Sequence, residues 1–162
     1  MKEIKTRIKS VESTKQITKA MELVSSSKFR KAKERAESAR PYFNTLYNTV
    51  QDIAKNTSNS RNVFLKERKV NNVCYIVIAG DRGLAGGYNS NILKAVIAHN
   101  KLGTGQVIPV GKKAKESLSK RGYEVIDYIE SIEKCVYEDA NRVAQAAMEA
   151  YKNGEVDEVN LV

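Results

Sequence analysis

The sequence contains no long apolar run. Its longest apolar stretches, such as Tyr75 to Ala79, fall far short of the roughly 20 residues that a helix needs to cross a bilayer. No apolar segment of the kind found in signal peptides follows Met1, and Glu3 and Glu12 argue against a transit peptide, which would be nearly free of acidic residues. The sequence therefore predicts a soluble chain that begins at an unprocessed Met1.

Cysteine and histidine are also scarce. Cys74 and Cys135 lie in distant segments and form neither a disulfide framework nor a metal motif, which favours a reducing cytoplasm. The single histidine, His99, is followed by Asn100 and Lys101 at the expected end of a helix, where a surface residue is more typical than a catalytic base. We find no cluster of metal ligands and no nucleophile–base pair in the sequence, so we predict no catalytic, cofactor-binding or metal-binding residue.

The standard phosphate-binding motifs are missing. The segment GDRGLAGGYN (residues 80–89) follows an apolar stretch and places four glycines at the expected end of a strand, where a doubly wound sheet can accept an anion. Neither G-x-G-x-x-G nor G-x-x-x-x-G-K-[ST] occurs, however, which disfavours nucleotide binding at this segment. Asp81 and Arg82 could form a catalytic pair, but a local ion pair or a partner contact is more typical of opposite charges in a turn.

Positive charge is concentrated near the N-terminus. The whole chain has a formal net charge of +9, with 28 Lys and Arg against 19 Asp and Glu. Residues 1–40 contain 12 Lys and Arg and 5 Asp and Glu, a net of +7, which leaves 16 minus 14, or +2, for the other residues. This bias favours an anionic partner, which could be nucleic acid, an acidic lipid surface or acidic protein loops.

The N-terminal third of the sequence predicts one long helix. From Lys2 to about Lys55 it has no glycine, and its apolar residues recur at helical spacing. After a phase slip, the spacing from Ala32 to Ile53 alternates between four and three, which defines heptads and predicts a coiled-coil seam that requires a partner helix. Because the heptad phase continues on both sides of Pro41, we expect a kinked but continuous helix. The seam residues are Ile4, Ile8, Val11, Ile17, Val24, Ala39, Phe43, Leu46, Val50 and Ile53.

The rest of the chain alternates strands with helices after a polar linker, residues 56–72. The expected strands are Val73–Ala79, Gln106–Val110, Tyr123–Ile129 and a fourth that starts within residues 155–162. The expected helices are Asn91–His99, Lys112–Lys120 and Val136–Tyr151. The predicted fold class is therefore α/β, with a coiled-coil-forming helix (1–55) and a Rossmann-like, doubly wound parallel sheet domain (73–162). We expect this domain to be incomplete at its C-terminal end, because the last strand has no stop signal.

Two segments together resemble a known family. The residues IKSVESTKQITKAMELVSSSKFRKA (8–32) and DRGLAGGYN (81–89) are similar to the gamma subunit of the rotary F-type ATP synthase, and the similarity extends over the whole chain. The resemblance implies that the long helix pairs with a C-terminal helix inside a ring of alpha and beta subunits, with the Rossmann-like domain beside this shaft. It also implies a rotor that couples ion flow through the membrane to ATP synthesis or hydrolysis on beta, without itself being catalytic.

The resemblance further implies partners and contact residues. The partners would be the alpha and beta subunits, the epsilon subunit and the membrane rotor ring, with no nucleic acid and no cofactor, at the cytoplasmic face of the bacterial plasma membrane. The helix residues that would face the ring are Lys19, Met21, Lys28, Arg30, Lys31 and Arg35. The residues of the glycine segment that would contact beta are Asp81, Arg82, Gly86 and Gly87.

The sequence departs from the family pattern in three places. Ala85 stands where a cysteine is common, Tyr88 stands where leucine is usual, and the sequence ends before the family's C-terminal helix. With that helix missing, we expect possible self-association through the seam. The alternative function is a basic helix that binds nucleic acid, or a coiled-coil interaction protein. The nucleic-acid alternative lacks stacking aromatic residues, because Phe29 stands alone in the basic stretch.

Overall fold

The computed structural model describes residues 2–57, 62–100 and 105–162. The chain divides into two compact units, residues 1–60 and residues 61–162, which are described separately below. Residues 58–61 of the expected linker and Met1 lie outside the described residues. No helix in the described ranges has both the length and the apolar character needed to pass through a bilayer.

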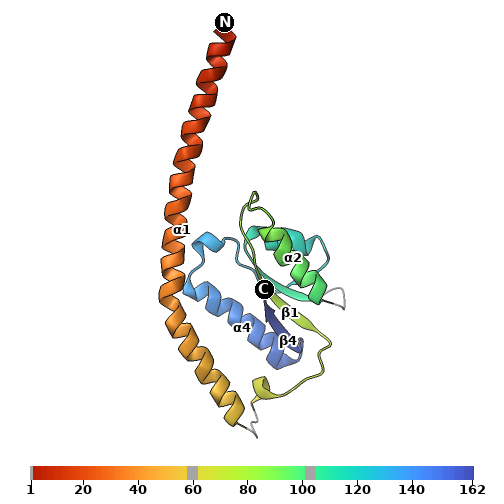
Figure 1. Ribbon diagram of the computed structural model, residues 1–162. Helices are drawn as coiled ribbons and strands as arrows, with labels where there is room; N and C mark the ends of the chain where they lie inside the picture. The colour runs from red at the N-terminus through yellow and green to blue at the C-terminus, as the bar shows by residue number, and fades with distance from the viewer. Residues whose placement is uncertain (1, 58–61, 101–104) are drawn as a thin grey trace. The chain divides into compact units, whose positions relative to one another are not determined.

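The first unit is one helix, α1 (Lys2–Asn56), and none of its residues is buried. It continues through Pro41, as predicted, although proline has no N–H to donate to the preceding turn. Figure 1 shows α1 as a single ribbon that bends along its length. Over residues 2–57 this unit has no buried apolar core, so the apolar side chains of α1 could be buried only by contacts outside the unit.

The second unit is built on a parallel sheet. Its strands are β1 (Val73–Ile78), β2 (Gln106–Val110), β3 (Glu124–Val125) and β4 (Glu158–Leu161), in the order β3-β2-β1-β4. All three pairings are parallel, and Figure 1 shows β1 and β4 side by side. Parallel neighbours require crossovers, which here are helices, so the carboxyl ends of the strands all lie at one edge of the sheet.

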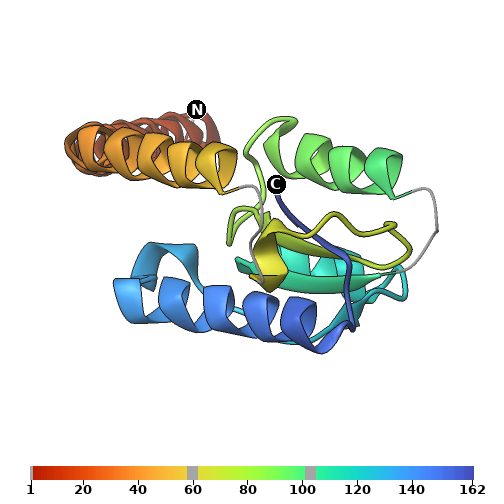
Figure 2. The same ribbon diagram turned by 90° about the horizontal axis from the view of Figure 1, so that it is seen from below.

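Helices cover both faces of the sheet, as Figure 2 shows. Alternate residues of β1 point to opposite faces, so Tyr75 and Val77 pack with α2 (Tyr88–His99) and α3 (Lys112–Ser119). Cys74, on the other face, packs with α4 (Tyr137–Asn153). Two buried apolar clusters result, one on each face of the sheet. The predicted α/β class with a doubly wound parallel sheet is thereby confirmed.

The third strand is shorter than the sequence predicts. A strand is present in the predicted range, but the predicted bounds Tyr123–Ile129 were wrong, because β3 contains only Glu124–Val125. Pro109 of β2 has its carbonyl directed at this side of the sheet, where it accepts the N–H of Ile129 at 2.9 Å. Since proline has no N–H, it cannot return a hydrogen bond to the neighbouring strand, and the regular ladder is interrupted there. The pairing resumes only as a single parallel bridge between Val110 and Ile129.

The segment before β1 is attached to the second unit. The short 3₁₀ helix Val63–Leu65 brings Phe64 onto the ring of Tyr151 in α4, with the ring centroids 5.6 Å apart. Arg68 also lies over the Tyr151 ring, with its Cζ 4.1 Å from the ring centroid. Its guanidinium donates to the Tyr151 carbonyl at 2.8 Å. Asp157 accepts hydrogen bonds from two further backbone N–H groups of this segment, each at 3.0 Å.

Candidate functional site

The Asp81 carboxylate joins three connections at the carboxyl edge of the sheet. Its Oδ2 accepts the hydroxyl of Ser131 at 2.8 Å, and its Oδ1 accepts the N–H of Ile132 at 3.2 Å and the N–H of Lys112 at 3.3 Å. Asp81 follows β1, Lys112 begins α3 after β2, and Ser131 follows β3. One side chain therefore holds together three loops that are distant in the sequence.

Hydrogen bonding keeps this carboxylate ionised. Partial burial raises the pKa of Asp81, but the Ser131 hydroxyl and several backbone N–H groups lower it by more, so the pKa lies below its ordinary value of 3.8. Each of these donors stabilises the ionised carboxylate more than the protonated one. At neutral pH, Asp81 is a charged acceptor whose oxygens are already engaged within its own chain.

Gly111 makes the approach of α3 to Asp81 possible. Its φ is 100°, in the region that favours glycine, and a Cβ at this position would lie 2.0 Å from the carbonyl oxygen of Ala79. The N–H of Gly111 donates to the Ile129 carbonyl at 2.9 Å. This close passage places the next N–H, that of Lys112, within reach of the Asp81 carboxylate.

A second set of hydrogen bonds fixes the base of the glycine loop, which we define as residues 80–87. The side-chain oxygen of Asn89 accepts the N–H of Gly80 at 2.8 Å, and its amide nitrogen donates to the Arg82 carbonyl at 3.2 Å. Helix α2 begins at Tyr88 instead of the predicted Asn91, because the N–H of Asn91 already bonds to the Gly87 carbonyl at 2.8 Å. The loop is thus held at its start by the Asn89 side chain and at its end by the first turn of α2.

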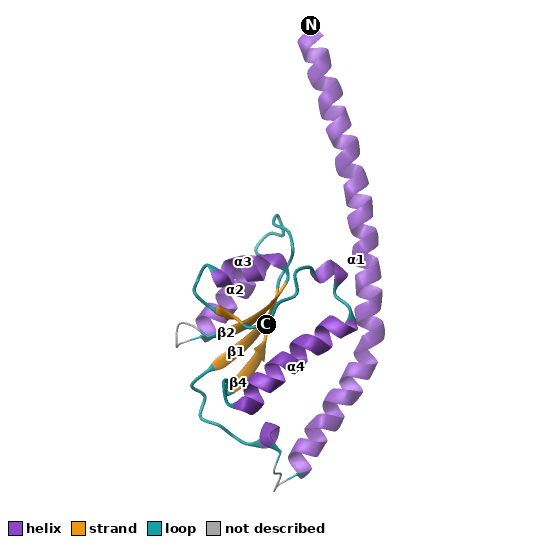
Figure 3. Cartoon of the chain, turned by 180° about the vertical axis from the view of Figure 1, so that it is seen from behind, coloured by secondary structure: helices purple, strands orange, loops and turns teal. Residues whose placement is uncertain are grey.

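The tip of the glycine loop projects from the sheet. Figure 3 shows it as a teal arch beyond the ends of the strands. Leu84 has a φ of 61°, which is uncommon for a residue with a side chain, and its relative exposure is 109%. Gly86 has a φ of 56°, so it turns the chain toward α2, as expected of a tight turn. Arg82 and Gly87 are exposed as well.

This edge is poorly suited to a phosphate group. A phosphate at the start of α3 would bind the N–H of Lys112, but the Asp81 carboxylate already accepts that donor. The surrounding pocket, of about 470 Å³, has carboxylates from Asp81, Glu130 and Asp139 against the amines of Lys112 and Lys134. The anion position at the start of α3 is therefore taken by the chain's own carboxylate.

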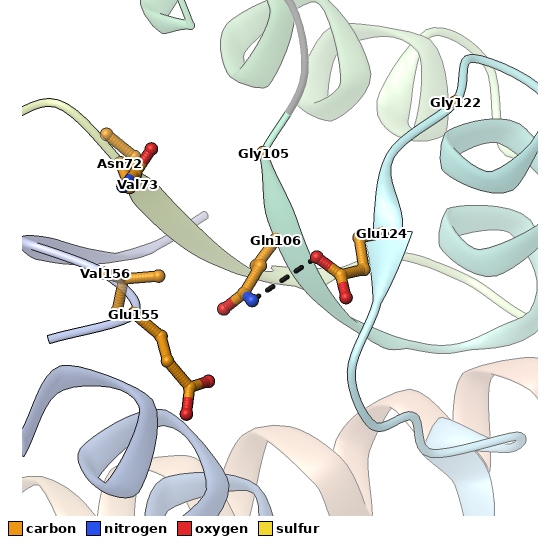
Figure 4. Close-up of a pocket in the computed structure, with 8 residues that line it drawn as sticks. All are labelled: Asn72, Val73, Gly105, Gln106, Gly122, Glu124, Glu155 and Val156. Atoms are coloured by element: carbon orange, nitrogen blue, oxygen red, sulfur yellow. Dashed lines mark hydrogen bonds between the residues drawn. The ribbon is translucent and has the colours of Figure 1, made fainter. Parts of the chain in front are cut away.

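A second pocket, of about 340 Å³, lies at the opposite, amino edge of the sheet (Figure 4). Gln106 donates through Nε2 to Glu124 at 3.3 Å, while its Oε1 is buried and has no partner among the described residues. Glu155 also lines this pocket, and the side chains of both glutamates are exposed. The sequence interpretation missed this edge, because its residues come from the starts of different strands and share no motif.

The predicted contact residues of α1 are all exposed. They are Lys19, Met21, Lys28, Arg30, Lys31 and Arg35. Arg30 lies 3.8 Å from Glu34, one helical turn further on, and the neighbouring Lys33 lies 3.7 Å from Glu37 in the same way. Such exposed pairs contribute little to stability, so the pair with Glu34 would cost little to break if Arg30 bound a partner.

The predicted seam of α1 is exposed along its whole length. Its residues are Ile4, Ile8, Val11, Ile17, Val24, Ala39, Phe43, Leu46, Val50 and Ile53. From Ala39 to Ile53 they are spaced four, three, four and three residues apart, which puts them on one side of the helix. Phe43 stacks on Tyr47 with ring centroids 5.8 Å apart, so the aromatic part of this face is ordered along the helix. An exposed apolar stripe of this kind is typical of an interaction surface.

Comparison with known proteins identifies relatives over the whole chain. A family model described as ATP synthase matches residues 1–162. The ATP synthase gamma chain of Alkaliphilus metalliredigens is 45% identical over 164 residues, covering 100% of this chain and 57% of that protein. The gamma chain of Lachnoclostridium phytofermentans is 44% identical, covering 99% of this chain and 56% of that protein. A sodium-ion-specific ATP synthase gamma chain of Acetobacterium woodii is 43% identical, covering 99% of this chain and 54% of that protein. The chain thus spans little more than half the length of these relatives.

Proposed function

Because the chain belongs to the gamma chain family of the ATP synthases, we propose that it supplies part of the central rotor shaft of such an enzyme. In this role it couples ion flow through a membrane to ATP synthesis or hydrolysis on the beta subunits and does not itself catalyse the reaction. The family assignment also disfavours the alternative that the basic helix binds nucleic acid.

The observation that carries this proposal is the fully exposed helix α1. At a rise of about 1.5 Å per residue, its 55 residues extend roughly 80 Å, far more than the width of the α/β unit. None of its residues is buried, and its apolar seam from Ala39 to Ile53 lies on one side. These properties fit a shaft whose seam is covered by a second helix of the same subunit.

The charge of the chain supports specific partners. The basic residues of α1, among them Arg30 and Arg35, suit acidic loops of the beta subunits in a ring of alpha and beta. The glycine loop suits a second contact with beta. The epsilon subunit and the membrane rotor ring would bind the α/β unit, which places the protein peripherally at the cytoplasmic face of a bacterial plasma membrane.

Assembly provides the first test of this function. The full-length subunit would be co-expressed with the alpha and beta subunits of the same organism, with an affinity tag on beta. We expect the subunit to co-purify with the hexamer, and the complex to hydrolyse ATP. Recovery of alpha and beta without the subunit, under conditions where all three are soluble, would count against the proposal.

Rotation provides the second test. The hexamer would be fixed to a surface through alpha or beta, and a bead would be attached to the α/β unit of the subunit. We expect the bead to turn in steps when ATP is added, because the shaft moves relative to the ring. A stationary bead on complexes that hydrolyse ATP would show that the subunit is a fixed component and not a rotor.

A further inference from the structure

We propose that Asp81 is a positioning residue, which fixes the base of the glycine loop so that Arg82 and Leu84 are presented to an acidic protein surface with an apolar recess. This inference rests on the proposed function, because it takes that surface to belong to the catalytic ring. It reassigns Asp81, which the sequence suggested as a direct contact, to a role within its own chain.

The first step is that the Asp81 oxygens are already engaged. Oδ1 accepts two backbone N–H groups, those of Lys112 and Ile132, and Oδ2 accepts the Ser131 hydroxyl. A partner that bound this carboxylate would have to replace charge-assisted hydrogen bonds made in a fixed geometry. Release of those donors would also detach the start of α3 and the segment after β3 from the loop.

The second step is that the neighbouring residues are held in a costly conformation. The Arg82 carbonyl accepts a hydrogen bond from Asn89, while Leu84 has a positive φ of 61° and almost no contact with its own chain. The left-handed backbone of a leucine costs free energy, and its fully exposed side chain gains no burial energy within the unit to offset that cost. Strained and exposed residues of this kind are typical of contact sites, where a partner recovers the burial.

The third step concerns the chemistry of the partner. Arg82 is exposed beside Leu84, so the tip of the loop offers one cation next to one branched apolar side chain. The complementary surface has a recess for leucine bordered by carboxylates, since a guanidinium binds carboxylates through paired hydrogen bonds.

A double-mutant cycle tests the positioning role. The variants Asp81→Asn, Leu84→Ala and their combination would be made in the full-length subunit, and binding to the purified hexamer of alpha and beta would be measured. We expect each single variant to weaken binding about tenfold and the double variant to weaken it by no more than about twentyfold, because Asp81 acts through the loop that carries Leu84. A roughly hundredfold loss in the double variant would show independent effects and would overturn the inference.

Asp157→Asn is the matched control. Asp157 also accepts two backbone N–H groups and also has a lowered pKa, but it lies before β4, at the other edge of the sheet. We expect it to bind like the wild type. If Asp157→Asn and Asp81→Asn lose the same affinity for the hexamer, Asp81 contributes only to the general stability of the unit, and the inference is wrong.

Hydrogen exchange separates local release from unfolding. In Asp81→Asn, we expect the amides of residues 82–88 to exchange on the order of tenfold faster, while those of β1 and β2 exchange as in the wild type. Ser131→Ala, which removes one of the donors, should give a smaller increase at the same amides. Unchanged exchange in the loop would contradict the inference.

The two proposals fail in different ways. If the wild-type subunit does not bind the hexamer, the proposed rotor function is wrong. If the wild type binds and rotates, and Asp81→Asn and Leu84→Ala bind the hexamer as tightly as the wild type does, the rotor function stands. Only the inference about the glycine loop is then wrong.

Discussion

Gly111 passes so close to Ala79 that a Cβ on Gly111 would lie 2.0 Å from the Ala79 carbonyl oxygen. The backbone of Gly111 also has a φ of 100°. These two constraints act at the point where β1 and β2 both end, which is the edge where Asp81 gathers the loops. The position of α3 therefore depends on the absence of a side chain at one residue.

Gly111→Ala should destabilise the α/β unit severely. A contact of 2.0 Å cannot be relieved by a side-chain movement, because the atom it meets is backbone. Together with the cost of a positive φ, we expect the free energy of unfolding to fall by about 3 kcal/mol or more, measured by urea denaturation. Gly122→Ala is the control. Gly122 also has a positive φ, of 81°, but nothing lies within 4 Å of its Cβ position, so its cost should be about 1 kcal/mol. Equal costs for the two variants would mean that the close contact has no effect.

The loss of stability at acidic pH should depend on Asp157. Hydrogen bonds from the N–H groups of Asn72 and Asn71 lower the pKa of Asp157 below its ordinary value of 3.8, and the nearby Arg68 adds to this effect. A carboxyl whose pKa is lower in the folded state stabilises the fold above its unfolded pKa, and this contribution is lost as the pH falls through the folded pKa. We therefore expect the urea midpoint of the wild type to fall as the pH drops below about 4, and to fall less steeply in Asp157→Asn. Parallel pH profiles for the two proteins would contradict this assignment.

The two thiols should differ sharply in reactivity. Burial raises the pKa of the Cys74 thiol to about 11, and its side chain is fully buried between β1 and α4. At about pH 8, about one Cys74 thiol in a thousand would be ionised, whereas Cys135 is partly exposed. We expect a thiol-specific reagent to modify one cysteine rapidly in the native protein and two after denaturation. Cys135→Ser should abolish the rapid phase, and rapid modification in that variant would place Cys74 at the surface.

The architecture could be predicted from the sequence because it follows from local patterns. The continuous apolar run of β1 and the helical spacing of apolar residues in α4 can each be recognised within a short stretch of sequence. The length of β3 could not be predicted in this way, because it is limited by Pro109 in a different strand. The interpretation of residues 123–129 as one strand considered only their own apolar character and not the hydrogen-bonding capacity of the strand beside them.

The arrangement around Asp81 was beyond sequence reasoning for a similar reason. The glycines and the pair Asp81-Arg82 marked the segment as important, but Ser131, which fixes Asp81, is an ordinary polar residue outside any motif. Asn89 ends the quoted segment, and nothing in the pattern indicated that its side chain would hold Gly80. Ser131 becomes a neighbour of Asp81 only because parallel strands bring their carboxyl ends to one edge. A sequence pattern can therefore identify a loop without revealing which of its side chains face inward.

The seam of α1 leads to a prediction for the 162-residue chain in isolation. With no second helix to cover the stripe from Ala39 to Ile53, we expect the chain to self-associate as its concentration rises, measured by sedimentation equilibrium. Leu46→Asp should weaken this association about tenfold or more, because it places a charge where an apolar side chain would be buried.

Asn48→Asp is the matched control for the seam. It adds the same carboxylate two residues further along α1, which at about 100° per residue is on the opposite side of the helix. We expect Asn48→Asp to associate like the wild type, and in the assembled enzyme only Leu46→Asp should reduce the recovery of the subunit with alpha and beta. If both variants weaken association equally, total charge and not the seam controls it. A wild-type chain that stays monomeric at every concentration would show that an exposed heptad stripe is not sufficient for helices of this chain to pair.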